Sequence, residues 1–438
     1  MEKQEKNINK IKYKYKDIDV CIEKTNKFTT TVFNIYYINK YDDNNYLSLV
    51  SELLTKCNGK YTSTEAQTRK LYDLYSAGVY SAQSMNYKTQ ILKCSVECIS
   101  ENIIDCDDLY DECFDLLNNM IYNPHVKVNS RGRTEFCKKD FDEVIENRIN
   151  LILNESNNKR RYGAMRFLSK MTKKDEFPLI QKMNINKIKK IKAYELYDYY
   201  LDFINNSHII VSVVGNVSVD KVNKLLNKLN LRTNNVNIEY EDKNLYRIIK
   251  TKRYVEKSEI KQSHIYMGYR TDLFYRHELY AAYILFCLMF GESPFSSLFS
   301  KVREELGLAY TIYASANPVR NLCTVYAGVD SNNINKAIKA IKDCLNSYNI
   351  HNINKNREYF ENLLNEAKSE FKNEYINSID NQEYIVSNNL KYYLTDRRTL
   401  EELYNDSLLV TLDDISKIKD HLWLDTIYVL KGLGENNE

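Results

Sequence analysis

Arg303 and Tyr310 are the two residues whose types and spacing best suit chemistry in this chain of 438 residues. Residues 295–306 predict a helix, and Gly307 supplies the left-handed position that commonly ends one. Tyr310 then enters the next strand, so both side chains could point into one cavity. A simpler interpretation stays open, in which the arginine is a solvated charge near a helix C-terminus and the tyrosine is strand packing.

The residues around this pair carry a family resemblance. The block 291–310 reads GESPFSSLFSKVREELGLAY. It resembles the C-terminal domain of pitrilysin/insulinase-family zinc peptidases, in which an Arg and a Tyr at this seven-residue step hold the substrate at the active site. The resemblance assigns those roles to Arg303 and Tyr310. The strands on either side, 262–270 and 324–328, also look like the family.

The zinc motif of the same family is missing. Catalytic members carry H-x-x-E-H on a helix of the N-terminal domain, where two histidines bind zinc and the glutamate activates water. The layout places this helix at 44–55, where Leu49 and Leu53 stand in place of the histidines and Glu52 in place of the base. The third ligand, a glutamate, should fall in 147–154, a stretch without any carboxylate.

The spacing of the other reactive residues offers no substitute site. No two of the six histidines lie three or four residues apart, and the ten cysteines form no C-x-x-C. No Walker loop, G-x-G-x-x-G or G-x-S-x-G is present. We therefore expect no metal and no cofactor in this chain, whereas the resemblance implies zinc in a partner subunit.

The elements that must position these residues form two similar halves. Residues 76–117 and 306–345 each predict a strand, a second strand and a helix. Each half also opens with a β-rich strand that leads into an apolar helix, and closes with a strand ending in glycine. The opening strands are 28–38 and 263–270, the helices 46–54 and 279–290, and the closing strands 208–215 and 426–432.

This repeat predicts an α+β fold of two homologous domains, each a mainly antiparallel β-sheet flanked by α-helices. We expect an N-terminal domain at 1–232 and a C-terminal domain at 251–438. Residues 233–250 are polar and without clear periodicity, which predicts a linker. The resemblance implies that the two domains form half of a peptidase clamshell.

The charge composition of the chain limits the classes of partner that we expect. The chain carries 62 Lys+Arg against 59 Asp+Glu, so its charge predicts neither nucleic acid nor membrane as a partner. Residues 1–16 are charged and lack the apolar core of a secretory signal. The longest apolar run, 279–290, is shorter than the ~20 residues that a bilayer span needs. We expect a cytoplasmic protein with reduced thiols.

The resemblance implies a function in trans. Family members work as four such domains, and in heterodimers one subunit has the zinc site while the other has the Arg/Tyr pair. The second pattern, seen here, implies a non-catalytic subunit, inactive alone, that joins a homologous H-x-x-E-H-bearing peptidase subunit acting on unfolded peptides. Three alternatives stay open: a scaffold or peptide-recognition subunit with no role in the chemistry, an independent hydrolase, and a homodimer of this chain.

Overall fold

The computed structural model describes residues 9–42, 44, 46–104, 106, 108–173, 175, 185–241, 248, 250–395 and 397–433. The chain divides into two compact units, and each is assembled from three segments. The first unit comprises 1–153, 182–240 and 379–394, and the second comprises 154–181, 241–378 and 395–438. Residues 242–247 and 249 of the expected linker lie outside the described residues.

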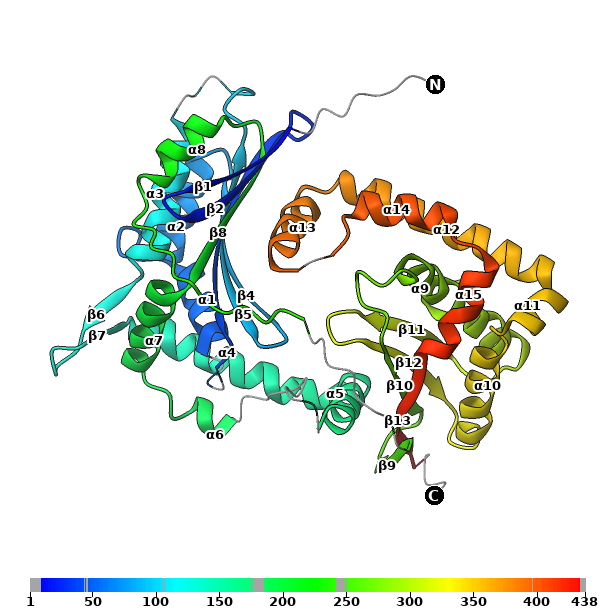
Figure 1. Ribbon diagram of the computed structural model, residues 1–438. Coiled ribbons are helices and arrows are strands. Elements are labelled where there is room, and N and C mark those ends of the chain that lie inside the picture. The colour runs from blue at the N-terminus through cyan, green and yellow to red at the C-terminus, as the bar shows by residue number, and fades with distance from the viewer. Residues whose placement is uncertain are drawn as a thin grey trace. The chain divides into compact units, whose positions relative to one another are not determined.

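The first unit is built on a six-stranded sheet with the order β1-β2-β8-β3-β5-β4 (Figure 1). Neighbouring strands run antiparallel except β2 and β8, which are parallel. The strands are β1 (Asn9–Tyr15), β2 (Ile18–Lys24), β3 (Thr30–Lys40), β4 (Gly78–Asn86), β5 (Thr89–Ile99) and β8 (His208–Gly215). A separate hairpin joins β6 (Val126–Val128) to β7 (Thr134–Phe136).

Helices cover this sheet on both faces. On β3, alternate side chains such as Phe33 and Ile35 join the large core under α1, α3 and α7, while Val32 and Tyr36 pack on the opposite face with α13. A strand buried on both faces explains its almost uninterrupted apolar run. The helices are α1 (Tyr46–Lys56), α2 (Thr64–Asp73), α3 (Leu109–Tyr122), α4 (Lys138–Asn157), α6 (Ile185–Ile188), α7 (Ala193–Asn206), α8 (Val219–Leu226) and α13 (Gln382–Leu394).

The second unit repeats the plan with five strands in the order β11-β12-β10-β13-β9. Here too the closing strand, β13, lies between an antiparallel neighbour, β10, and a parallel one, β9. The strands are β9 (Lys252–Ser258), β10 (Ser263–Thr271), β11 (Thr311–Asn317), β12 (Leu322–Val329) and β13 (Leu422–Gly432). Because β2-β8-β3-β5-β4 follows the same scheme, the topology supports the internal repeat that the sequence predicts.

The helices of the second unit include two π segments. One overlaps the start of the block 291–310, and the other lies inside it. The helical elements are α5 (Lys159–Met171), α9 (Tyr280–Cys287), the π segments η1 (Leu288–Glu292) and η2 (Leu298–Glu305), α10 (Ile334–Asn346), α11 (Ile350–Lys355), α12 (Arg357–Ile379), α14 (Leu400–Leu409), α15 (Leu412–Ile418) and the 3₁₀ turn η3 (Lys419–His421). The α+β class with antiparallel-rich sheets is thus confirmed in both units.

Two segments pack on a sheet from the other half of the sequence, an exchange that was not expected. Helix α5, from the N-terminal half, packs on β10 and β13. Two glycines permit this close approach: a Cβ on Gly268 would lie 2.4 Å from the Met171 sulfur, and one on Gly163 would lie 2.7 Å from the Tyr266 hydroxyl. Helix α13, from the C-terminal half, packs in turn on β3 and β8.

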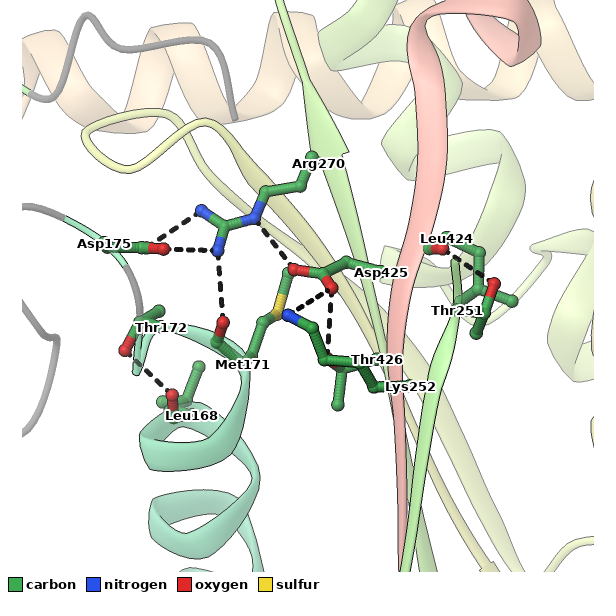
Figure 2. A network of polar contacts seen from close by, with 10 residues as sticks. All are labelled: Leu168, Met171, Thr172, Asp175, Thr251, Lys252, Arg270, Leu424, Asp425 and Thr426. Carbon is green, nitrogen blue, oxygen red and sulfur yellow. Dashed lines mark hydrogen bonds and ion pairs between the residues drawn. The ribbon is translucent and has the colours of Figure 1, made fainter. Parts of the chain in front are cut away.

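A buried network of charges holds the end of α5 against the second sheet (Figure 2). Arg270 on β10 donates to both carboxylate oxygens of Asp175, at 2.9 and 2.7 Å, and to the Met171 carbonyl at 3.2 Å. Its Nε also donates to Asp425 on β13, which pairs with Lys252 at 3.0 Å. Buried charges are tolerated when they are paired in this way.

Among the residues that the structure describes, no helix combines the length and the apolar character needed to cross a bilayer.

Candidate functional site

Helix α1 forms where the sequence predicts it, and the two positions expected to carry metal ligands lie on its apolar face. Leu49 and Leu53 are 0% and 4% exposed and belong to the core of the first unit. Their burial follows from helical periodicity, because both lie on the face that packs against the sheet and its neighbouring helices. Two buried leucines have no donor atom to offer a metal.

Glu52 lies on the same helix, and its carboxylate is paired with a guanidinium. Arg148 on α4 donates through Nη2 to Glu52 Oε1, and the two side chains are 25% and 34% exposed. Lys56 and Glu143 form a second ion pair between the same two helices. Arg148 comes from the stretch 147–154, where a third metal ligand was sought. With a cation beside Glu52 and leucines in the ligand positions, these residues do not fit the zinc ion of the catalytic family members.

Arg303 lies in η2, a π-helical segment within the range 295–306 where the sequence predicts a helix. The Leu306 N–H donates to the Lys301 carbonyl at 3.1 Å, five residues back, as in a π-helix. Such segments are rare and often occur at functional sites. The Arg303 side chain is 41% exposed, lies over the Phe299 ring at 4.5 Å, and reaches Glu304 at 3.5 Å.

Gly307 and Tyr310 connect η2 to β11. Gly307 has φ +59°, the left-handed conformation that was predicted to end the helix. The Tyr310 N–H donates to the Gly328 carbonyl at 2.9 Å, which extends the pairing of β11 with β12 by one residue. The Tyr310 side chain remains 60% exposed.

Asp330 is the polar partner of Tyr310, and the sequence analysis missed it. The Tyr310 hydroxyl donates to the Asp330 carboxylate, with both oxygens at 3.1 Å. This hydrogen bond raises the pKa of Tyr310 above its ordinary value. The antiparallel register of β11 and β12 is the signal that could have revealed the pair, since Thr311 lies opposite Gly328.

The shared cavity expected for Arg303 and Tyr310 stays a prediction. A hollow of about 440 Å³ opens beside η2, lined by residues that include Val302, Leu306 and Lys339. Neither Arg303 nor Tyr310 belongs to its lining. Both residues thus lie at the surface of the second unit, where a macromolecular partner can reach them.

Comparison with known proteins shows which family this chain resembles. Residues 190–362 match the family model described as the peptidase M16 inactive domain. The chain is also 24% identical over 432 residues to a Bacillus subtilis protein named probable inactive metalloprotease YmfF, covering 97% of this chain and 98% of that protein. This chain is therefore similar to peptidase M16 proteins, through the family model over residues 190–362 and through one relative over nearly its whole length. The resemblance to zinc peptidases drawn from the block 291–310 is thereby confirmed.

Three further proteins are similar over all or part of the chain. A second Bacillus subtilis protein, named uncharacterized zinc protease YmxG, is 24% identical over 237 residues, or 52% of this chain and 55% of that protein. A conserved protein from Enterococcus faecalis shares the fold with a TM-score of 0.89 at 22% identity, covering 98% of this chain and 100% of that chain. The M16 inactive domain from Pseudomonas fluorescens shares it at 0.74 and 13% identity, covering 97% and 98%.

Proposed function

We propose that this M16 chain is the non-catalytic subunit of a two-subunit zinc peptidase, to which it supplies Arg303 and Tyr310. One contrast carries the proposal. The helix that bears zinc in catalytic members has buried leucines and a neutralised glutamate here, whereas the Arg/Tyr pair is retained and exposed. A chain with half of a site can take part in the chemistry when a partner brings the other half.

The two side chains suit the charge that develops during peptide hydrolysis. Attack of water on a peptide carbonyl forms a tetrahedral intermediate with a negative oxygen. The planar guanidinium of Arg303 and the hydroxyl of Tyr310 are donors that can be aimed at this oxygen or at the neighbouring peptide carbonyl. Each donor of this kind typically contributes about 3 kcal/mol to transition-state stabilisation.

The partner in this proposal is a homologous M16 chain with an intact H-x-x-E-H motif, and the substrate is an unfolded peptide. Such a peptide can lie as an added strand along a sheet edge of the partner. The comparisons support a pairing of this type, since Bacillus subtilis has one relative named as probably inactive and another named as a zinc protease.

Co-purification with such a homologue tests the proposal. The two chains should elute together in size-exclusion chromatography, and the complex should cleave unfolded peptides much faster than either chain alone. Separate elution at every salt concentration would contradict the assembly. A stable complex that is no faster than the zinc-bearing chain alone would instead indicate a scaffold or peptide-recognition subunit.

A further inference from the structure

A group of three potential metal ligands lies in the first unit, just beyond the end of α1. Cys57 follows the last residue of α1, His125 precedes β6, and Asp140 lies in the first turn of α4. An isolated β-bridge pairs Asn58 with Pro124, so the backbone itself sets Cys57 and His125 side by side. The three side chains therefore meet because three separate elements converge.

Their ligand atoms point at a common centre. The His125 Nδ1 atom lies 2.7 Å from Asp140 Oδ2 and 3.2 Å from Cys57 Sγ. The distance from Cys57 Sγ to Asp140 Oδ2 is 3.5 Å. One sulfur, one imidazole nitrogen and one carboxylate oxygen thus form a small triangle, and all three are atoms that bind transition metals.

The geometry does not suit a catalytic triad. In a triad the imidazole uses one nitrogen for the nucleophile and the other for the carboxylate. Here Cys57 and Asp140 both contact the same nitrogen of His125, so a proton relay across the ring is not set up. The three ligand atoms instead lie close enough to one another for a single cation to contact all of them.

The charges of the group also favour a cation. Cys57 is 3% exposed, and the His125 and Asp140 side chains are each 16% exposed. The Asp140 carboxylate is thus a shielded negative charge that lies beside a thiol and an imidazole. A divalent ion bound here would deprotonate the thiol outright.

We propose that Cys57, His125 and Asp140 bind a divalent transition-metal ion, for which zinc is the best chemical match. Binding releases the Cys57 proton to solvent and leaves a thiolate, a neutral imidazole and a carboxylate as ligands. Three protein ligands leave a fourth tetrahedral position for water. Cys137, which is 5% exposed, lies beside the group, because its backbone N–H donates to the His125 carbonyl at 3.0 Å.

This site is distinct from the H-x-x-E-H motif of the family. It also departs from the expectation, drawn from the sequence, that this chain binds no metal. That expectation rested on the spacing of histidines along the chain, which gives no sign of ligands from distant segments. The bound ion would tie the end of α1 to the start of α4 and to the base of the β6–β7 hairpin. A ligand that binds the folded state alone raises its stability.

Metal titration of the chelator-treated full chain tests the site. Titration with Co²⁺ should give one ion per chain with a thiolate-to-cobalt absorption band, and Zn²⁺ should displace it and raise the melting temperature. The C57S and H125A variants should lose more affinity than the ~10–100-fold caused by loss of a supporting outer residue. The matched variants C106S and H351A should bind as the parent chain does.

Circular dichroism establishes that each variant is folded, and D140N provides a further ligand variant if C57S is not. Failure of the parent chain to bind Co²⁺ or Zn²⁺ would overturn the proposal. So would binding that C57S and H125A leave unchanged, or a cobalt complex without the thiolate band. The test is independent of any partner subunit.

Discussion

Glu52 on α1 and Arg148 on α4 form an ion pair at the position where the family resemblance would place a general base beside zinc. A guanidinium supplies the positive charge there, but it has no open position at which to bind and acidify water. The pair therefore stabilises the contact between two helices. At the exposures of these side chains, such a pair contributes about 1 kcal/mol or less.

The first prediction follows from this pairing. Glu52→Gln in this chain should leave the turnover of the assembled peptidase unchanged, because the carboxylate has no metal-bound water to activate. The same substitution at the H-x-x-E-H glutamate of the partner should abolish turnover. Peptide hydrolysis by the two complexes provides the comparison. A large loss caused by Glu52→Gln would show that α1 still takes part in the chemistry.

The second prediction concerns the exposed pair of the second unit. Arg303→Ala or Tyr310→Phe should lower kcat of the complex by ~10²–10³, as expected for loss of a donor to a developing oxyanion. Arg303→Lys should restore activity in part, because an ammonium lacks the planar fork of donors.

The matched controls for this pair are Arg357→Ala and Tyr72→Phe, which alter exposed residues of the same types. Both should behave as the parent chain. Complex formation and the zinc content of the partner should stay constant throughout. Full activity of both Arg303→Ala and Tyr310→Phe would show that these two residues do not hold the substrate in the complex.

The third prediction assigns Asp330 a positioning role that acts through Tyr310. Asp330→Asn weakens the acceptor that orients the phenol, so kcat should fall less than it does in Tyr310→Phe. In a Tyr310→Phe background the same change should have no further effect, since the hydroxyl that it orients is gone. A double-mutant cycle on kcat measures this coupling. Additive losses would indicate a separate, structural role for Asp330.

The fourth prediction concerns stability. Arg270→Ala should lower the free energy of unfolding by ~3–5 kcal/mol, because it removes the guanidinium that pairs with two buried carboxylates, those of Asp175 and Asp425. Urea denaturation measures the change, with Arg357→Ala as the exposed control, which should cost under ~1 kcal/mol. A loss for Arg270→Ala as small as that of the control would show that the network in Figure 2 adds little to the fold.

Local patterns predict most of the elements that carry the candidate site. The strand predicted at 208–215 is β8 (His208–Gly215), and the helix that follows it, α8, has Ser218 as its N-cap, with the side chain accepting from the Lys221 N–H. The strand pair of each half appears as β4–β5 and β11–β12. These features depend on neighbouring residues, so periodicity and capping are sufficient to find them.

The sequence predicts a helix at 295–306 without its type, and the structure gives the π segment η2 at Leu298–Glu305. A wider hydrogen-bonding turn leaves the apolar spacing almost unchanged, so the sequence pattern cannot distinguish the two forms. The choice depends on packing, in which Leu298 and Val302 are fully buried in the core of the second unit. The direction in which the Arg303 side chain leaves the helix depends on the same hydrogen-bonding pattern.

The sequence by itself determined the family resemblance, the leucines at the two expected histidine positions and the seven-residue step from Arg303 to Tyr310, because these are facts of residue type and short spacing. The tertiary structure decided which distant residues meet. It paired Glu52 with Arg148 and gathered the ligand group around His125. It also set α5 and α13 on sheets from the other half of the chain. An apolar helix face needs burial, but its pattern does not specify which surface will cover it.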